Sequence, residues 1–279
     1  MKPIILVDAR NTAYRAVFAA RNNIMNGLHP YTVWMRFIHQ WVEKFKPESI
    51  HIFWDCKTKH VWRKALYEEY KNNRSHVYNR YDDFNVSKQL NRLESAANSV
   101  LPHSNIRQYK IDTQEADDLI YAACKMTDKD GIIISSDKDL TQIIWQMDDI
   151  QIYDPIKAHF IEKPGCNPVV EKSLVGDKSD NIHGYKGIGP VKARRLMGDI
   201  PALREFLNKN GADTFRRNLA LIDMSKNPSL DTNIQYVKSV MDSEVDFNKS
   251  NIKKLIIENK ITGFMSEYHD LITPLQRLI

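Results

Sequence analysis

The chain has 279 residues, 42% hydrophobic and 27% charged, which allows one large domain or two smaller ones with a sizeable core. No apolar stretch approaches the roughly 20 residues of a membrane span, and no signal peptide is expected. The unpaired spacing of Cys56, Cys124 and Cys166 excludes a disulfide framework or zinc site. We therefore expect a cytoplasmic protein. The net charge of +5 equals that of window 57–80 alone, and a second basic window covers 186–217, which favours a polyanionic partner.

Two apolar runs near the N-terminus each end on an aspartate. The apolar run within residues 3–9 closes on Asp8, and the run at 49–55 closes on Asp55. Both runs are typical of buried strands. By itself such an aspartate is more often a helix N-cap than a metal ligand. Apolar residues at helical spacing predict helices over 31–45 and 81–100, which Pro47 and Pro102 end.

Basic and aromatic residues alternate in the window that follows the second strand, with Trp62, Tyr67, Tyr70 and Tyr78 among seven Lys and Arg. This mixture suits phosphate contacts and base stacking on a single strand. A run of charge is also typical of plain solvated surface.

Further apolar runs at 105–111, 131–135 and 150–153 predict more strands. Because they alternate with helical stretches, we expect an α/β fold with a mostly parallel sheet flanked by helices.

Five carboxylates surround the strand at 131–135: Glu115, Asp117, Asp118, Asp137 and Asp139. Ligands bind at strand ends in such folds, and a hard divalent cation such as Mg²⁺ or Mn²⁺ would offset the repulsion between these groups. Helix-dipole complementation is an alternative for the three carboxylates that begin the helix, but it does not explain Asp137 and Asp139.

The stretch 175–196 combines acids, glycines and bases. Asp177 and Asp180 are expected on the same side of a helical turn. Gly187 and Gly189 then lead through a tight turn into a basic helix, an arrangement that suits a backbone phosphate. The remainder carries no readable motif beyond Arg216 and Arg217 as candidate backbone contacts.

Together these pieces resemble the flap endonuclease / 5'→3' exonuclease family, most closely its bacteriophage members called ribonuclease H. The matching segments, in order, are LVDARN, FWD with WRK and YKNNR, EADD, ISSDKDLTQ and GDKSDNIHGYKGIGPVKA. They span residues 8 to about 196, and the ordered set is far more specific than any piece. A softer match lies at NLALID, residues 218–223.

The resemblance implies a PIN-like α/β core, a helical arch and a helix–three-turn–helix that grips duplex DNA. It places the nuclease core at residues 1–185, the arch at about 56–100, a helical duplex-binding region packed on the core at 186–279, and the helix–three-turn–helix at about 182–198.

The resemblance also implies roles for individual residues. The ligands of a first metal ion would be Asp8, Asp55, Glu115, Asp117, Asp118 and Asp137, and those of a second would be Asp139, Asp177 and Asp180. The catalytic residues would be Lys71, Arg74, Asp117 and Asp137. The DNA contacts would be Arg63, Lys64, Tyr70, Gly187, Gly189, Lys192, Arg194 and Arg195. Which basic residue makes the main duplex contact is left open, because Val191 follows the proline of GIGP.

The implied function is a structure-specific 5' nuclease of DNA replication that hydrolyses phosphodiesters with two Mg²⁺, for which Mn²⁺ can substitute, and a K⁺ in the helix–three-turn–helix. Its substrates would be branched or nicked DNA, 5' flaps and RNA primers in RNA–DNA hybrids. We expect a monomer in the cytoplasm, that of the host if the gene is phage-borne, with a single-stranded-DNA-binding protein or sliding clamp as candidate partners and no membrane. The alternatives are a non-catalytic DNA-binding module on this scaffold and a PIN-type ribonuclease.

Overall fold

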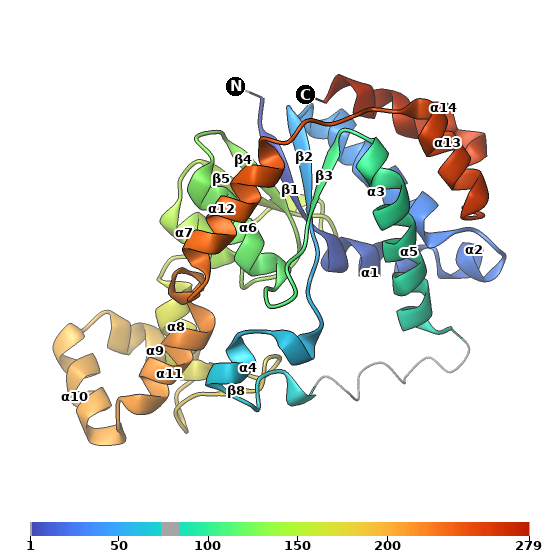
Figure 1. The fold of residues 1–279 in the computed structure, drawn as a ribbon. Coiled ribbons are helices and arrows are strands. Elements are labelled where there is room, and N and C mark those ends of the chain that lie inside the picture. Colours follow the sequence, from blue (N-terminus) through green and yellow to red (C-terminus); the bar gives the residue numbers. More distant parts are fainter. Residues whose placement is uncertain (1, 74–83, 279) are drawn as a thin grey trace.

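A six-stranded sheet forms the centre of the computed structural model, which describes residues 2–73 and 84–278 (Figure 1). The strand order is β3-β2-β1-β4-β5-β6, and every pairing is parallel except that of β6 with β5. The strands are β1 (Ile4–Asp8), β2 (Ser49–Phe53), β3 (Ile106–Tyr109), β4 (Gly131–Ile134), β5 (Ile150–Asp154) and β6 (His159–Phe160). The predicted mostly parallel sheet is therefore confirmed.

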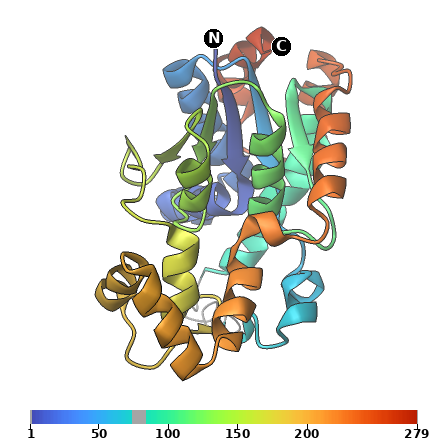
Figure 2. The same ribbon diagram turned by 90° about the vertical axis from the view of Figure 1, so that its left-hand side faces the viewer.

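Helices cover both faces of this sheet (Figures 1 and 2). One face carries α1 (Ala9–Ala19), α3 (Pro30–Phe45), α5 (Val86–Val100), α13 (Lys249–Glu258) and α14 (Tyr268–Ile272), with α2 (Arg21–Met25) beside them. The other face carries α6 (Ala116–Met126), α7 (Thr141–Gln146) and α12 (Leu230–Met241). Short 3-10 turns cover Thr58–His60, Leu101–His103, Met224–Lys226, Met265–Glu267 and Thr273–Arg277.

The strand side chains alternate between two hydrophobic cores. Ile5 and Val7 of β1 pack under α1 and α3, whereas Ile4 and Leu6 pack under α6. A strand buried on both faces has no polar face to show, which is why its sequence is a continuous apolar run. The helix expected at 31–45 is α3, which ends where Lys46 takes a left-handed conformation (φ 47°) before Pro47.

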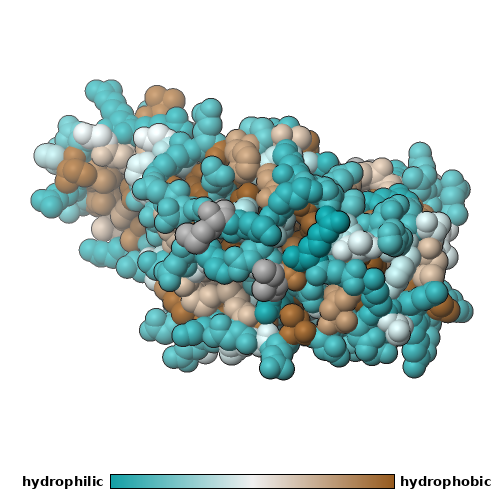
Figure 3. All heavy atoms as spheres, turned by 90° about the horizontal axis from the view of Figure 1, so that it is seen from above, coloured by the Kyte–Doolittle hydropathy of each residue, from teal (hydrophilic) through white to brown (hydrophobic). Residues whose placement is uncertain are grey.

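The last fifth of the chain returns to the sheet after a long excursion. Helix α12 packs against α6, while α13 packs against α5. The predicted division of the chain at residue 185 stays a prediction. Among the described helices none is long and apolar enough to cross a bilayer. Seen from above, most of the surface is hydrophilic and hydrophobic side chains are scattered (Figure 3).

The excursion forms an extension below the sheet in both ribbon views (Figures 1 and 2). It consists of α8 (Pro168–Val175), β7 (Gly176–Asp177), β8 (Ile182–His183), α9 (Pro190–Met197), α10 (Ile200–Asn210) and α11 (Asp213–Ile222), and α4 (Arg63–Leu66) lies beside it. The expected tight turn is present: Gly187 has φ 77°, Gly189 is the N-cap of α9, and Pro190 is its first residue.

The expectation that Asp177 and Asp180 share a helical turn is wrong. Helix α8 ends at Val175. Asp177 is the last residue of β7, and Asp180 lies in the turn that joins the two short strands β7 and β8. Asp177 Oδ1 accepts from Ser179 N at 2.8 Å and from Asp180 N at 3.3 Å, so a turn, not a helix, brings the two residues together. The cause is Gly176, whose φ of 85° and ψ of 175° cannot continue a helix.

We predict that Gly176→Ala destabilises the protein, because a Cβ there would lie 2.4 Å from Gly184 N and the backbone region is almost exclusive to glycine. The free energy of unfolding in urea should fall by about 1–3 kcal/mol or more. Gly165→Ala is the matched control, since its Cβ would meet nothing within 4 Å. Equal stability of the two variants would contradict this account of the hairpin.

Candidate metal centre

The carboxyl ends of three neighbouring strands bring the first carboxylates together. Asp8 ends β1 and pairs in register with Phe53 of β2, two residues before Asp55, while Asp137 follows β4 on the other side. Asp8 also caps α1, because Asn11 N donates to its Oδ1 at 3.0 Å, and its Oδ2 accepts from Ser135 Oγ at 2.9 Å. The N-cap role and a place at the strand edge are thus both realised.

Helix α6 begins at the same edge and adds more acids. Ala116 N donates to Asp55 Oδ1 at 2.9 Å, which joins the start of α6 to the end of β2. Asp117, on the first turn, lies close enough to Asp137, Asp8 and Asp55 that after burial their charges raise its pKa well above the ordinary value.

Four of these carboxylates share one electrostatic condition. Within residues 2–73 and 84–278, Asp8, Asp55, Asp117 and Asp137 form no ion pair with a lysine or arginine. Burial, together with repulsion from Asp55 and Asp137, raises the pKa of Asp8 to about 7. Burial and the nearby Glu115 raise that of Asp55. The charges of Lys71 and Arg10 offset the rise at Asp55 only in part, so repulsion within the group remains for a bound cation to relieve.

Glu115 and Asp118 are instead compensated by basic side chains. Arg63 donates to Glu115 Oε2 at 2.7 Å and to both oxygens of Asp118 at 2.8 and 2.9 Å. Lys71 pairs with Glu115 as well. Burial alone would raise the pKa of Glu115, but Lys71 and Arg63 lower it to about 2. Glu115 and Asp118 also form a capping box at the start of α6, so part of their role is structural.

Arg63 lies in the interior and not on a DNA-facing arch surface as expected. It is only 4% exposed, and its Nε donates to the carbonyl oxygen of Leu221 on α11 at 2.8 Å. A buried arginine whose guanidinium makes four hydrogen bonds in this way positions carboxylates and is not presented to a phosphate on the surface. Asp118, 1% exposed and held by Arg63, is similarly enclosed.

The remaining acids, Asp139, Asp177 and Asp180, lie beside Lys172 and Tyr70. Lys172 of α8 pairs with Asp139 and, at 2.7 Å, with Asp177. Asp180 Oδ2 lies 2.9 Å from the hydroxyl of Tyr70, whose oxygen is also 2.9 Å from Glu115. A cavity of about 20 Å³ is lined by Glu115, Asp117, Asp139, Asp177 and Asp180 together, which the printed sequence places up to 65 positions apart.

Besides the bond of Tyr70 with Asp180, three further hydrogen bonds tie segment 69–73 to the hairpin 176–183. Lys71 N donates to Asp180 O at 2.9 Å, Asn181 Nδ2 to Glu69 O at 2.8 Å, and Asn73 Nδ2 to Lys178 O at 2.7 Å. Lys71 itself takes a left-handed φ of 57°, a costly conformation that these bonds maintain. Its ammonium consequently lies among the carboxylates. The second predicted basic residue, Arg74, lies outside the described residues.

The donor set fits a hard divalent cation, since it consists of carboxylate oxygens only. In the part of the chain that the structure describes, however, no three such side chains are arranged so that they could hold a metal ion as they stand. Like charges without a cation between them repel, and Lys71 and Lys172 hold several of the oxygens in other directions. The residues predicted from sequence are thus brought together without forming a closed ligand set.

The predicted duplex contacts lie on the surface of the extension. Lys192 is exposed and donates to Gly187 O at 3.0 Å, and Arg194 is exposed and donates to Glu171 at 3.0 Å. Arg195 is also exposed, while Lys64 is half-buried and donates to Asn72 at 2.6 Å. Tyr70, predicted to contact DNA, is 2% exposed and faces the carboxylates.

Three buried amides that the sequence analysis missed hold α11 and the segment that follows it against this centre. Asn218 donates to the carbonyl oxygens of Ser173 and His183 at 3.0 and 2.9 Å. Gln142 donates to Ile222 O at 3.1 Å and accepts from Met224 N at 2.9 Å. Gln114 accepts from Asn227 and Asn233. The NLALID match, which begins at Asn218, was the one signal that could have pointed to this region.

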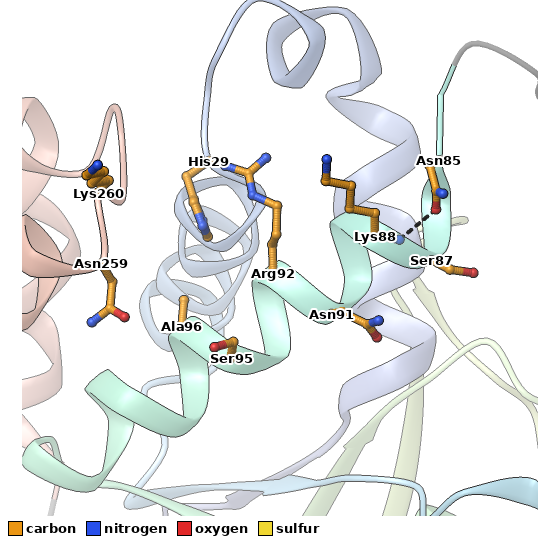
Figure 4. A pocket seen from close by; sticks show the side chains of 10 residues that line it. All are labelled: His29, Asn85, Ser87, Lys88, Asn91, Arg92, Ser95, Ala96, Asn259 and Lys260. Atoms are coloured by element: carbon orange, nitrogen blue, oxygen red, sulfur yellow. Dashed lines mark hydrogen bonds between the residues drawn. The ribbon is translucent and has the colours of Figure 1, made fainter.

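A separate polar groove lies on α5, away from the carboxylates (Figure 4). It has a volume of about 820 Å³. Lys88 and Arg92 of α5 line it, His29 lies next to Arg92, and Asn259 and Lys260 lie beyond His29. Burial and the charge of Arg92 lower the pKa of His29 to about 4, so its ring is neutral near pH 7. None of these residues was selected from the sequence.

Comparison with known proteins places this site in context. Residues 3–173 match the family described as 5'-3' exonuclease, N-terminal resolvase-like domain. DNA polymerase I of Bacillus subtilis is 29% identical over 227 residues, which cover 74% of this chain and 24% of that protein. The thermostable DNA polymerase I of Thermus aquaticus is 27% identical over 262 residues, 88% of this chain and 30% of that one. The chain thus spans about a quarter to a third of the length of these relatives.

Solved structures with a similar fold include nucleases bound to DNA. A bacteriophage T5 flap endonuclease, in a complex with DNA and metal ions, superimposes with a TM-score of 0.65 at 18% identity over 92% of this chain and 99% of that one. The catalytic core of Rad2 with a DNA substrate gives a TM-score of 0.50 at 14% identity over 98% and 92% of the two chains. These likenesses confirm the predicted PIN-like fold.

The repulsion between the uncompensated carboxylates predicts a specific pH dependence for the metal-free protein. A carboxyl whose folded pKa is raised from 3.8 to about 7, as for Asp8, favours folding below about pH 4 and loses that contribution as the pH rises through 7. We expect Asp8→Asn, which retains the capping oxygen, to stabilise the protein at pH 8 by about 1–3 kcal/mol and to matter little at pH 4. Unfolding in EDTA at both pH values measures this, and a variant that is less stable at pH 8 would contradict it.

Proposed function

The chain belongs to the 5'-3' exonuclease family, and on this basis we propose that it is a structure-specific 5' nuclease that hydrolyses phosphodiesters in DNA with divalent metal ions. The proposal includes removal of 5' flaps and of RNA primers from RNA–DNA hybrids during replication. The observation that carries it is a group of four carboxylates at the carboxyl edge of the sheet, Asp8 buried and Asp55, Asp117 and Asp137 half-buried, which form no ion pair among the described residues.

We propose Asp8, Asp55, Asp117 and Asp137 as the main ligands of a first Mg²⁺, and Asp139, Asp177 and Asp180 as those of a second. The burial of the first group and the raised pKa of three of its members support this division, because a dication offsets the repulsion they share. Glu115 borders both groups. Arg63 and Asp118 would position Glu115 rather than contact metal or DNA. Mn²⁺ would substitute for Mg²⁺, and K⁺ in the helix–three-turn–helix is proposed from resemblance alone.

The chemistry requires a nucleophile, charge stabilisation and a leaving group. Bound at these carboxylates, divalent ions would supply an activated water and stabilise the leaving oxygen. Lys71 is held at the edge of the centre by its backbone bond to Asp180 O, so its ammonium can stabilise charge that develops on the phosphoryl oxygens. We propose the same role for Arg74 from the resemblance. The products would carry a 5'-phosphate and a 3'-hydroxyl.

DNA would contact the protein on two sides of this centre. We propose that the core, residues 1–185, contains an arch near 56–100 for the single-stranded 5' arm, and that the turn at Gly187 and Gly189 with α9 grips the duplex. Two backbone features support the duplex contact: Gly187 is in the left-handed region, and α9 presents its N-terminus and basic residues to solvent. A single-stranded-DNA-binding protein or a sliding clamp is a candidate partner of a monomeric enzyme in the cytoplasm.

A cleavage assay on three substrates distinguishes this function from its alternatives. A 5'-flap DNA, an RNA–DNA hybrid and a single-stranded RNA would each be incubated with and without Mg²⁺. A 5' nuclease cleaves the first two only with metal. A non-catalytic binding module cleaves none, and a PIN-type ribonuclease cleaves the RNA alone.

Asp137→Asn should abolish cleavage while leaving flap binding nearly intact. Asp137 Oδ1 accepts a hydrogen bond from Asp139 N at 2.9 Å. The amide oxygen of asparagine can accept the same bond, so the loop after β4 should keep its shape while the ligand charge is lost. Loss of a metal contact of several kcal/mol should cost far more than about tenfold in rate. Asp148→Asn, which removes an exposed charge paired with Lys163, is the control. Turnover above about 10% of wild type in Mg²⁺ would contradict the assignment.

Lys192→Ala should weaken binding to duplex substrates and reduce the slope of log affinity against log salt by about one charge. Turnover at saturating substrate should change little, because Lys192 is exposed on α9 and bonded only to Gly187 O among the described residues. Lys254→Ala on α13, also exposed, is the matched control. An unchanged slope would show that Lys192 makes no phosphate contact, and Arg194 and Arg195 would be tested next.

A further inference from the structure

Lys172 has no part in the reaction proposed above, yet its ammonium lies among the acids of that site. It projects from α8 and pairs with Asp139, which follows β4, and with Asp177 Oδ2 of β7 at 2.7 Å. Those two aspartates are two of the three proposed ligands of the second metal ion. A carboxylate oxygen that accepts from an ammonium is turned toward that ammonium and away from another cation.

We propose, building on the function proposed above, that Lys172 is an internal counter-cation that a divalent metal ion must displace from Asp139 and Asp177. The lysine would thereby set the affinity of the second metal site. It would also make the two sites unequal, because no lysine among the described residues pairs with Asp8, Asp55, Asp117 or Asp137, whereas Lys71 pairs with Glu115, which borders both sites.

The charges of the two sites support this inequality. Asp8, Asp55, Asp117 and Asp137 form no ion pair in the described ranges 2–73 and 84–278, so a cation that reaches them relieves repulsion without displacing a paired lysine or arginine. At the second site Lys172 overcomes the effect of burial on Asp177 and lowers its pKa to about 2. At Asp139 Lys172 also lowers the pKa but only partly offsets burial, which leaves that pKa raised to about 6. A metal ion there gains the carboxylates only after their existing partner has left.

The structure also contains space for the displaced side chain. A cavity of about 350 Å³ is lined by Lys172 and Asp139 together with Gln142, Val175, Gly176 and Ile222. The lysine side chain is 29% exposed, and its four-carbon stem can rotate without movement of α8. Asp139 also lines the small cavity that it shares with Asp117 and Asp180, so the ammonium lies where the two spaces meet.

The test is a titration of the intact protein with Mn²⁺ in the absence of DNA. Binding is measured by calorimetry and by the electron paramagnetic resonance signal of free Mn²⁺. We expect wild type to show a tighter and a weaker class of site. In Lys172→Met, which keeps the stem and removes the charge, the weaker class should tighten by about tenfold or more while the tighter class is unchanged. Lys172→Arg should behave like wild type, because it keeps the positive charge. Lys163→Met, which removes an exposed charge paired with Asp148, is the matched control.

A weaker class that is unchanged, weakened or absent in Lys172→Met would overturn the proposal, since a lysine that only organises the acids would give that result. If the methionine variant does not fold, Lys172→Gln is titrated instead, and the shift of its melting temperature with Mn²⁺ must exceed that of wild type. The readout needs no cleavage. Inactivity of every protein on flap DNA would therefore contradict the nuclease function, whereas unaltered Mn²⁺ affinity would contradict the role of Lys172.

Discussion

Repulsion between buried carboxylates is the constraint on which this structure depends. Parallel strands deliver Asp8, Asp55 and Asp137 to one edge, and the start of α6 adds Glu115, Asp117 and Asp118. Burial and mutual repulsion raise the pKa values of several of them, so the metal-free fold is maintained against its own electrostatics. A site that needs cations must tolerate this cost, which the two cores on the faces of the sheet offset.

The protein compensates some of these charges and leaves others without a partner. Arg63 and Lys71 hold Glu115 and Asp118, and Lys172 holds Asp139 and Asp177. Each of these cations comes from an element outside the sheet: α4, the segment after it, or α8. These ion pairs therefore hold the sheet and the extension together. The same contacts that neutralise charge also determine where the extension begins relative to the site.

Helix α11 completes this attachment from the other side. Leu221 O accepts from Arg63, Ile222 O accepts from Gln142, and Asn218 bridges α8 to β8. The bonds from Arg63 and Gln142 reach carbonyl groups at the end of α11, where a helix leaves its last acceptors unsatisfied. A surface that is proposed to grip a duplex is thus connected to the carboxylates by short, buried hydrogen bonds, a connection that suits positioning of DNA over the centre.

The sequence by itself determined the sheet and most of the acids, whereas their partners required the tertiary structure. Apolar runs that end on aspartate predicted β1 and β2, because strand burial and strand ends are local properties of the chain. The hairpin at Asp177 was mistaken for a helical turn, because spacing alone cannot show that Gly176 packs against Gly184. Arg63 was taken for an arch residue and Lys172 was overlooked, because their carboxylate partners lie 52 to 55 and 5 to 33 positions away. Charge in a sequence shows which groups must be compensated; only the fold decides which cation reaches which acid and which acids are left for a metal.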